Sequence, residues 1–369
     1  MRHSGRYARV GVAVGAVLAI AGCAPPSTSG APSTAATATS AAALGGMDAL
    51  VAAAKKEGQL NLVSTAPDWA NYAAIMAGFQ AKYGIKINDD NPEGSSQDEI
   101  NAVKRLAGTD RAPDALDIGV RELADTSLFA PYQVATWKDI PDAQKEPSGL
   151  WVQDYGGYMA IGYDSSKVSA ITSVQDLLKP EFKGKIALFA DPTASNSALS
   201  AVMMTSLANG GSLDDISKGV EFFAKLKKAG NFVPVAATKA TVANGTTPVV
   251  INWDYLAVSF ATDVPAWTLL IPSGAIVAGF YNQAVNKGAP HPAAARLWME
   301  YLYSNEGQNL FLEGGARPVR MDAMTKQGVI DAPAAAKLPP VSGPGNFINL
   351  NQATAAKAYL VANWANAIS

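Results

Sequence analysis

Short apolar segments with strand character alternate with helical segments along most of this chain, and this alternation restricts the possible folds most strongly. Strands are predicted at 60–64, 115–120, 158–163, 185–190, 232–235, 249–253, 268–271 and 277–285. Helices are predicted at about 68–83, 96–107, 197–208, 213–229 and 292–303, and in the tail to residue 369. Strands that alternate with helices predict an α/β fold. From residue 47 onward the chain is about twice the usual length of one domain, so two lobes are expected.

The chain contains one cysteine, Cys23, which closes a pattern typical of exported proteins. Three arginines precede a short apolar run at 10–20, and small residues lead from that run to Cys23. The pattern resembles the lipobox of a bacterial lipoprotein, which implies that a signal peptide, residues 1–22, is removed and that Cys23 receives lipid such as palmitate. Because a membrane-spanning helix needs roughly 18 or more apolar residues, this lipid is the expected attachment to the outer face of the cell membrane. A lone cysteine also excludes an internal disulfide.

A flexible tether is expected to follow the lipid, over residues 23–46. Residues 24–46 consist almost wholly of Ala, Pro, Ser, Thr and Gly and carry no charge, so they cannot bury enough apolar surface to offset the entropy lost on ordering. Beyond the signal segment, 26 of the 29 basic residues stand against 31 acidic ones, a formal charge of −5. Nucleic acid is therefore not an expected partner, because its binding proteins usually show a basic stripe.

Four motifs, in order along the chain, carry a resemblance to a known family. They are LVAAAKKEG at 50–58, KPEFKGKI at 179–186 with ADP at 190–192, VINWDY at 250–255, and YSNEGQ at 303–308 with GGARP at 314–318. Together they resemble bacterial extracellular solute-binding proteins of ABC importers, in the group that handles ferric iron, polyamines, thiamine and aminophosphonates. Each motif is weak alone, but their order and coverage make the resemblance strong.

The resemblance implies an α/β, two-lobed periplasmic-binding-protein-like fold of type II, with two crossover segments and a ligand cleft between the lobes. Lobe one would comprise residues 47–157 plus 266–369, and lobe two residues 158–265. The protein would be a monomeric, non-enzymatic lipoprotein without a cofactor. It would capture a small solute by hinge closure and deliver it to an ABC permease and its ATPase complex.

Polar residues that directly follow strands are the first candidates for ligand binding. Ligands of open α/β sheets lie beyond the carboxyl ends of strands, where helix N-termini offer free N–H groups. The candidates at such positions are Ser64, Thr65, Ser95, Asp191, Ser195 and Asn196. Helix capping is the alternative role: Ser96 with Glu99 is predicted to form a capping box, and one of Ser195, Asn196 and Ser197 is predicted to cap the following helix.

Aromatic and acidic residues after a later strand are the second group of candidates. Trp253, Asp254 and Tyr255 combine rings that can stack on a ligand with a carboxylate that can pair with an amine. Tyr281 looks like the cleft aromatic of related polyamine-binding proteins. A buried packing role is the alternative for Trp253 and Tyr281. If Trp253 lines the cleft, Trp253→Ala is expected to abolish binding and leave the fold intact.

The identity of the solute stays open at this stage. An amine would suit the aromatic residues with Asp254, an anion would suit the Ser/Thr-rich helix starts, and an aminophosphonate would use both. Ferric iron and thiamine are alternatives within the family, and a sensor or scaffold lipoprotein is an alternative outside transport. No metal site is expected, because Tyr255 has no tyrosine neighbour and His291 is the one histidine beyond the signal segment. The chain also lacks a G-x-S-x-G nucleophile motif.

Overall fold

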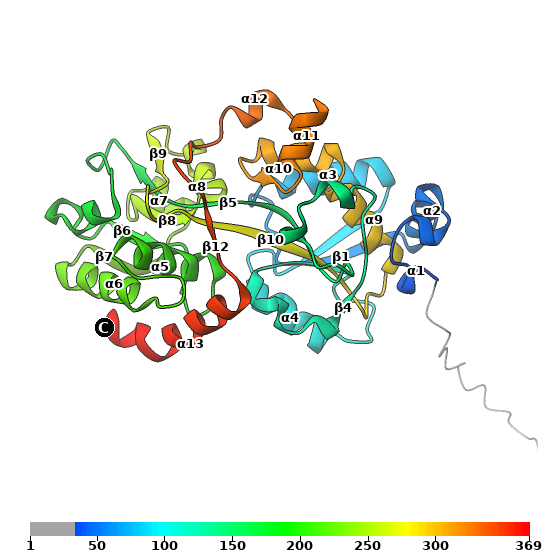
Figure 1. Ribbon diagram of the computed structural model, residues 1–369, viewed down its shortest axis with the longest axis horizontal. Helices are drawn as coiled ribbons and strands as arrows, with labels where there is room; N and C mark the ends of the chain where they lie inside the picture. The colour runs from blue at the N-terminus through cyan, green and yellow to red at the C-terminus, as the bar shows by residue number, and fades with distance from the viewer. Residues whose placement is uncertain (1–33) are drawn as a thin grey trace, which may run out of the picture.

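The computed structural model describes residues 34–369, which form two lobes joined by long strands (Figure 1). Strands β5 (Val152–Asp164) and β10 (Val277–Asn286) extend from one lobe into the other, and the C-terminal segment with β12 (Asn346–Phe347) runs beside them. This architecture confirms the predicted fold class. The signal segment and Cys23 lie outside the described residues.

Lobe one contains the first strands of the chain and the helices that cover them. Its strands are β1 (Gln59–Val63), β2 (Lys86–Asp90), β3 (Ala115–Ile118), β4 (Phe129–Ala130) and β11 (Arg317–Pro318). Its helices are α2 (Met47–Glu57), α3 (Tyr72–Tyr83), α4 (Ser96–Arg105), α9 (Pro292–Leu302), α10 (Asn305–Glu313), α11 (Met321–Gln327) and α12 (Ala332–Ala335). β1 and β2 are parallel to each other, whereas β3 and β4 run antiparallel to β10. The carboxyl ends of β1 and β3 therefore deliver their following residues to the side that faces lobe two.

Lobe two is built on a sheet in the order β5, β8, β6, β7, with β9 also paired to β5. Its strands are β6 (Ile186–Leu188), β7 (Phe232–Ala236), β8 (Val249–Trp253) and β9 (Trp267–Leu270). Its helices are α5 (Asn196–Ala208), α6 (Ser217–Ala229), α7 (Lys239–Ala243) and α8 (Asp254–Ala257). Because β6 is parallel to both β7 and β8, the segments that follow these strands emerge at one edge of the sheet.

The two crossover strands pair at a point where only glycine fits. β5 and β10 run antiparallel and meet through Gly157 and Gly279. A Cβ atom on Gly279 would collide with the ring of Trp253, and one on Gly157 would collide with the carboxylate of Asp254. The absence of side chains lets the strands and the end of β8 approach closely, which fixes where the lobes join.

The segment before residue 47 departs from the predicted tether. Residues 34–46 include a helical turn, α1 (Thr34–Thr37), and they dock on lobe one. The buried guanidinium of Arg296 donates from Nε to the carbonyl of Ala38 at 2.8 Å and from Nη2 to that of Ala36 at 2.9 Å. The prediction of a flexible tether was therefore wrong for residues 34–46. The buried guanidinium of Arg296 in α9 holds this segment by hydrogen bonds that composition alone does not reveal.

The C-terminal helix, α13 (Leu350–Ala367), packs against α6 and α5 of lobe two as well as against the turn 120–124 of lobe one, although the predicted boundaries assigned residues 266–369 to lobe one alone. The ring of Trp364 lies 5.2 Å from that of Phe223 in α6 and 6.0 Å from that of Phe232 in β7. β9 also pairs with the lobe-two part of β5. The chain therefore returns to lobe two at its end, and the segment around β12 becomes a third connection between the lobes (Figure 1).

Candidate functional site

A cavity of about 290 Å³ lies where the two lobes face each other, and we call it the cleft cavity. Lobe one contributes residues after β1 and β2, Asp117 within β3 and the first turn of α4, and lobe two contributes the start of α5 and the segment after β8. Six predicted residues line this cavity: Ser64, Ser95, Ser195, Asn196, Tyr255 and Tyr281. The structure thus brings together side chains that are far apart in the sequence, at the edge where strand ends and helix starts meet.

Four other predicted residues lie away from the cleft cavity. Thr65 is buried, and its hydroxyl donates to the carbonyl of Val63. Asp191 is exposed and accepts hydrogen bonds from the backbone N–H and hydroxyl of Thr193 at 2.7 and 2.6 Å, so it shapes a turn. Trp253 lines a different cavity.

Asp254 is fully buried, and its carboxylate is already occupied. It forms an ion pair with Arg317 and accepts the backbone N–H groups of Tyr158 and Tyr255 at 2.9 and 3.0 Å. Burial raises its pKa, whereas the charge of Arg317 acts in the opposite direction. The prediction that Asp254 pairs with a ligand amine is therefore corrected: in this structure it joins the end of β8 to the crossover strand and to β11.

The start of α4 differs by one residue from the predicted capping box. Ser95 caps the helix by accepting the N–H of Asp98, whose carboxylate in turn accepts the N–H of Ser95 at 2.8 Å. The predicted pair, Ser96 and Glu99, instead lies on the buried face of the helix toward β3. There the carboxylate of Glu99 accepts the backbone N–H of Asp117 at 2.9 Å. For α5 the prediction is confirmed, because Ser195 is its cap.

Asp117, at the end of β3, is the central acid of the cleft cavity. Its Oδ2 atom accepts hydrogen bonds from the hydroxyls of Tyr72 and Tyr155 at 3.0 and 2.9 Å, and its Oδ1 atom is buried with no hydrogen-bond partner among the residues that the structure describes. Burial raises the pKa of Asp117 to about 7, although both tyrosine hydrogen bonds lower it. Burial also raises the pKa of Glu99, and the charge of Asp117 adds to this effect. Two desolvated carboxyls therefore adjoin the cavity.

The charges around the cleft cavity are all of one sign. Glu93, Asp98, Glu99 and Asp117 line it, and no Lys, Arg or His among the described residues does so. Three tyrosine rings complete the lining: Tyr155 and Tyr281 stack at 5.9 Å between ring centroids, and Tyr155 meets Tyr255 edge-on at 5.5 Å. Carboxylates beside aromatic faces are the surroundings that stabilise a bound cation.

Two further polar groups adjoin the cavity without a partner. The hydroxyls of Ser64 and Tyr255 are buried and make no hydrogen bond in the part of the chain described. Ser64 also has a left-handed backbone, with φ of 58°, which is unfavourable for a residue other than glycine and is found mainly at functional sites. Unpaired buried hydroxyls at this position are what a bound polar ligand would satisfy.

Contacts across the cleft show that the lobes are closed on each other. Arg121 donates to the carbonyl of Ala194 at 2.9 Å, and the amide of Asn196 donates to Glu122 at 2.9 Å. Farther out, Lys239 of lobe two forms an ion pair of 2.8 Å with Asp68 of lobe one. The cleft cavity is thus enclosed by both lobes at once.

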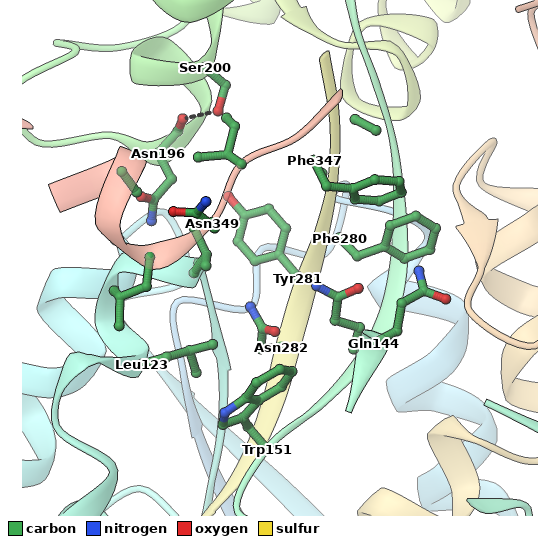
Figure 2. Close-up of a pocket in the computed structure, with 18 of the residues that line it drawn as sticks. Leu123, Gln144, Trp151, Asn196, Ser200, Phe280, Tyr281, Asn282, Phe347 and Asn349 are labelled. Atoms are coloured by element: carbon green, nitrogen blue, oxygen red, sulfur yellow. Dashed lines mark hydrogen bonds between the residues drawn. The ribbon is translucent and has the colours of Figure 1, made fainter. Parts of the chain in front are cut away.

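A second cavity, of about 660 Å³, adjoins the crossover strands, and we call it the hinge cavity (Figure 2). Its lining includes the β10 residues 278–282, the segment 347–353 and the second turn of α5. Trp253 lines this cavity and not the cleft cavity, whereas Asn196 and Tyr281 line both. The predicted residues are therefore divided between two neighbouring cavities.

Sequence reasoning missed the residues that give the cleft cavity its charge. Asp117 and Glu99 were not ligand candidates, and Tyr155 was interpreted only as a marker of the crossover. One signal for Asp117 was available: it interrupts an otherwise apolar strand, and a buried carboxylate needs partners. Glu99 was assigned to the helix cap instead.

Metal and membrane features were searched for over residues 34–369. In that range no three His, Cys, Asp or Glu side chains are grouped so that they could hold a metal ion. His291 is bound instead to Asp114, at 2.9 Å from its Nδ1 atom, and to Gln59. No helix in the same range combines the length and hydrophobicity needed to cross a bilayer.

Comparison with known sequences and structures agrees with this architecture. Residues 120–340 match the family described as bacterial extracellular solute-binding protein. The fold is similar to that of AfuA from Actinobacillus pleuropneumoniae with bound fructose-6-phosphate, with a TM-score of 0.66, 17% identity, and coverage of 85% of this chain and 99% of that one. It is also similar to the spermidine/putrescine-binding protein PotD from Streptococcus pneumoniae, with a TM-score of 0.59, 16% identity, and coverage of 84% and 99%.

A third similar structure is iron-bound HitA from Pseudomonas aeruginosa, with a TM-score of 0.62, 19% identity, and coverage of 82% of this chain and 99% of that one. These three proteins differ in what they bind. At identities below one fifth the likeness concerns the fold, so the ligand has to be argued from the side chains of this chain.

Proposed function

We propose a ligand class for this chain on the premise that it belongs to the bacterial extracellular solute-binding protein family and is the non-enzymatic, solute-binding component of an ABC transporter. The proposed ligand is a small organic cation, an amine such as a polyamine, held in the cleft cavity. The observation that carries this proposal is the lining itself: four carboxyl groups and no basic side chain among the described residues.

The buried acids favour a cation for a physical reason. Asp117 and Glu99 are desolvated, which penalises their charged forms and raises the pKa of each. An ammonium group close to Asp117 would compensate that penalty and would donate to the unpaired Oδ1 atom. The rings of Tyr255 and Tyr281, which line the cavity, would add cation–π attraction.

An anionic group receives no comparable support. The capping box of Ser95 and Asp98 already places a carboxylate at the N-terminus of α4, and a like charge at the same place would be repelled. Arg121 is held by Glu122 and by the carbonyl of Ala194, and Lys239 by Asp68. The phosphonate of an aminophosphonate would therefore lack a cationic partner, so a polyamine suits the cavity better.

Capture by hinge closure follows from where the contacts originate. Asp117, Glu99 and Ser64 belong to lobe one, whereas Ser195, Asn196 and Tyr255 belong to lobe two. A ligand that touches both sets stabilises only the closed form, so it shifts the population toward closure. We further propose, from the sequence pattern around Cys23, that a lipid anchors the monomer to the outer face of the membrane, where its permease and ATPase complex receive the solute.

A binding screen of the purified protein tests the proposal. Spermidine, putrescine, aminoethylphosphonate, thiamine, ferric iron and inorganic phosphate would each be titrated while the unfolding temperature is recorded. A polyamine is expected to raise that temperature saturably, because a ligand that binds only the folded state stabilises it. Saturable binding of phosphate or iron with no response to amines would overturn the proposed ligand class. No response to any of them would favour the sensor or scaffold alternative.

A further inference from the structure

The hinge cavity is separated from the cleft cavity by direct contacts between the lobes. The amide of Asn196 donates to Glu122 at 2.9 Å, and its side chain lies directly against the backbone at Gly119. These residues form a partition, with the acidic cavity on one side and the hinge cavity on the other. A molecule in the hinge cavity would therefore have its own contacts, apart from any ligand in the cleft.

Among residues 34–369, no Asp, Glu, Lys, Arg or His lines the hinge cavity. Its volume of about 660 Å³ is more than twice that of the cleft cavity, which is about 290 Å³, and it falls in the range of small-molecule sites. A charged molecule would lose its hydration in this cavity and gain no ionic partner. The occupant that fits is uncharged.

Several polar groups around this cavity have no partner. Asn282 is fully buried, and its Nδ2 atom donates to the carbonyl of Ile118 at 3.0 Å, but its Oδ1 atom accepts no hydrogen bond from any residue of 34–369. The Oε1 atom of Gln153 is likewise buried and unpaired. Both atoms are acceptors, so they require N–H or O–H donors from an occupant. The partly exposed amide of Gln144, which also lines the cavity, makes no hydrogen bond within the described residues (Figure 2).

Aromatic rings surround these amides. Phe280 and Phe347 stack with their centroids 6.1 Å apart and their planes 27° from parallel, and Trp151 lies across the cavity from Phe347 (Figure 2). Phe347 remains 52% exposed, although an aromatic side chain gains most when its faces are covered. A flat ring placed against Phe347 and Phe280 would cover it.

We propose that the hinge cavity is a second binding site, for an uncharged ring-containing molecule that carries N–H or O–H donors. Neutral heterocycles and neutral sugars share this chemistry: an apolar ring face for the aromatic side chains, and donors for Asn282 and Gln153. The site would act independently of the amine that we propose for the cleft. Its walls include the crossover strand β10 and the segment 347–353, so an occupant would contact both connections at the hinge.

Two neutral probes test this site, uridine for the heterocycles and cellobiose for the sugars. Each would be titrated into the whole purified protein while tryptophan fluorescence is recorded, because Trp151 and Trp253 line the cavity. One of the two is expected to bind saturably, and the one that binds identifies the source. Phe347→Ala is expected to weaken that binding by about fivefold, since a stacked aromatic contact is worth about 1 kcal/mol.

Matched variants make the test specific. Phe347 is exposed, so Phe347→Ala is expected to fold, and Ser64→Ala changes only the cleft cavity and is expected to leave the neutral probe unaffected. Three results would each overturn the proposal: no saturable binding of either probe, binding that Phe347→Ala does not weaken, or displacement of the neutral probe by spermidine. Because the amine screen uses other ligands and another cavity, its failure would be distinguishable from failure here.

Discussion

The cleft cavity and the hinge cavity share Asn196 and Tyr281, yet in the part of the chain that the structure describes four carboxyls line the first and none lines the second. A single helix contributes to both: the first turn of α5 faces the cleft, and its second turn, with Leu199 and Ser200, faces the hinge. The difference arises from what lies opposite. Strand ends and a capped helix start gather acids in the cleft, whereas packed strands and the C-terminal segment enclose the hinge. Two adjacent cavities of one closed protein can therefore differ sharply in the charge of their lining.

Trp253→Ala tests whether this tryptophan belongs to the hinge and not to the cleft, and we expect it to have the largest effect. Its side chain is 4% exposed and packs against Gly279 at the crossing of the strands. Truncating a buried tryptophan costs about 3–5 kcal/mol of folding free energy. Amine affinity of the folded protein is expected to change by less than about tenfold, which corresponds to 1.4 kcal/mol.

Chemical denaturation and ligand titration, done on the same Trp253→Ala sample, separate these effects. Lost amine binding with unchanged stability would mean that Trp253 contacts the amine in the cleft, as the sequence alone predicted. Lost stability with retained binding would support its assignment to the hinge.

Asp117→Asn tests the charge of the cleft cavity directly. The change keeps an acceptor for the hydroxyls of Tyr72 and Tyr155 but removes the negative charge. Amine affinity is expected to fall about 100-fold, since breaking a buried charge pair costs about 2–5 kcal/mol. Binding of a neutral probe in the hinge cavity is expected to stay the same, because Asp117 does not line it.

The matched control for Asp117→Asn is Asp263→Asn, which removes the same charge from an exposed position outside both cavities. Isothermal titration calorimetry of both variants would measure the difference. Equal losses of amine affinity in the two variants would mean that overall charge, and not the cleft acid, attracts the ligand.

The comparison also shows what a sequence can predict about such a protein. Strand β8 spans the predicted residues 249–253, because an apolar run bounded by polar residues is a local signal. The capping box of α4 was placed one residue late, because both Ser95 and Ser96 can cap and the choice depends on which face β3 buries. That one-residue shift was enough to hide Glu99 from the predicted site.

Long-range contacts account for the other departures. Nothing local indicates that Trp364 packs on Phe223, so the contact of the C-terminal helix with lobe two was not predicted. Trp253 and Tyr255 are only two residues apart, yet they line different cavities. The sequence therefore predicted which segments meet at the junction of the lobes, but not which of their side chains line which cavity.

The dependence of binding on pH gives the smallest expected effect and separates the two cavities without any mutation. Burial raises the pKa of Asp117 from 3.8 to about 7, so this carboxyl is partly protonated near neutral pH in the free protein. A bound ammonium favours the ionised form. Amine affinity is therefore expected to rise with pH up to about 7, by at most about tenfold per pH unit for one carboxyl, and to level off at higher pH. Glu99, Asp154, Tyr72 and Tyr155 surround Asp117, and Glu99, whose pKa is also raised, acts in the same direction.

The stability of the ligand-free protein is expected to change with pH in the opposite direction. The folded carboxyl of Asp117 holds its proton more tightly than an unfolded one, so its contribution is most favourable below pH 4 and is lost as the pH rises through 7. Binding in the hinge cavity is expected to be constant from pH 5.5 to about 8. Among the described residues, Tyr281 is the one ionisable group that lines this cavity, and burial raises the pKa of its phenol above the usual value of 10. Titrations of spermidine and of the neutral probe across this range would show the contrast. If both affinities followed the same pH curve, the carboxyls of the cleft cavity would have to influence both sites. That result would contradict the proposal that the two cavities bind their ligands independently.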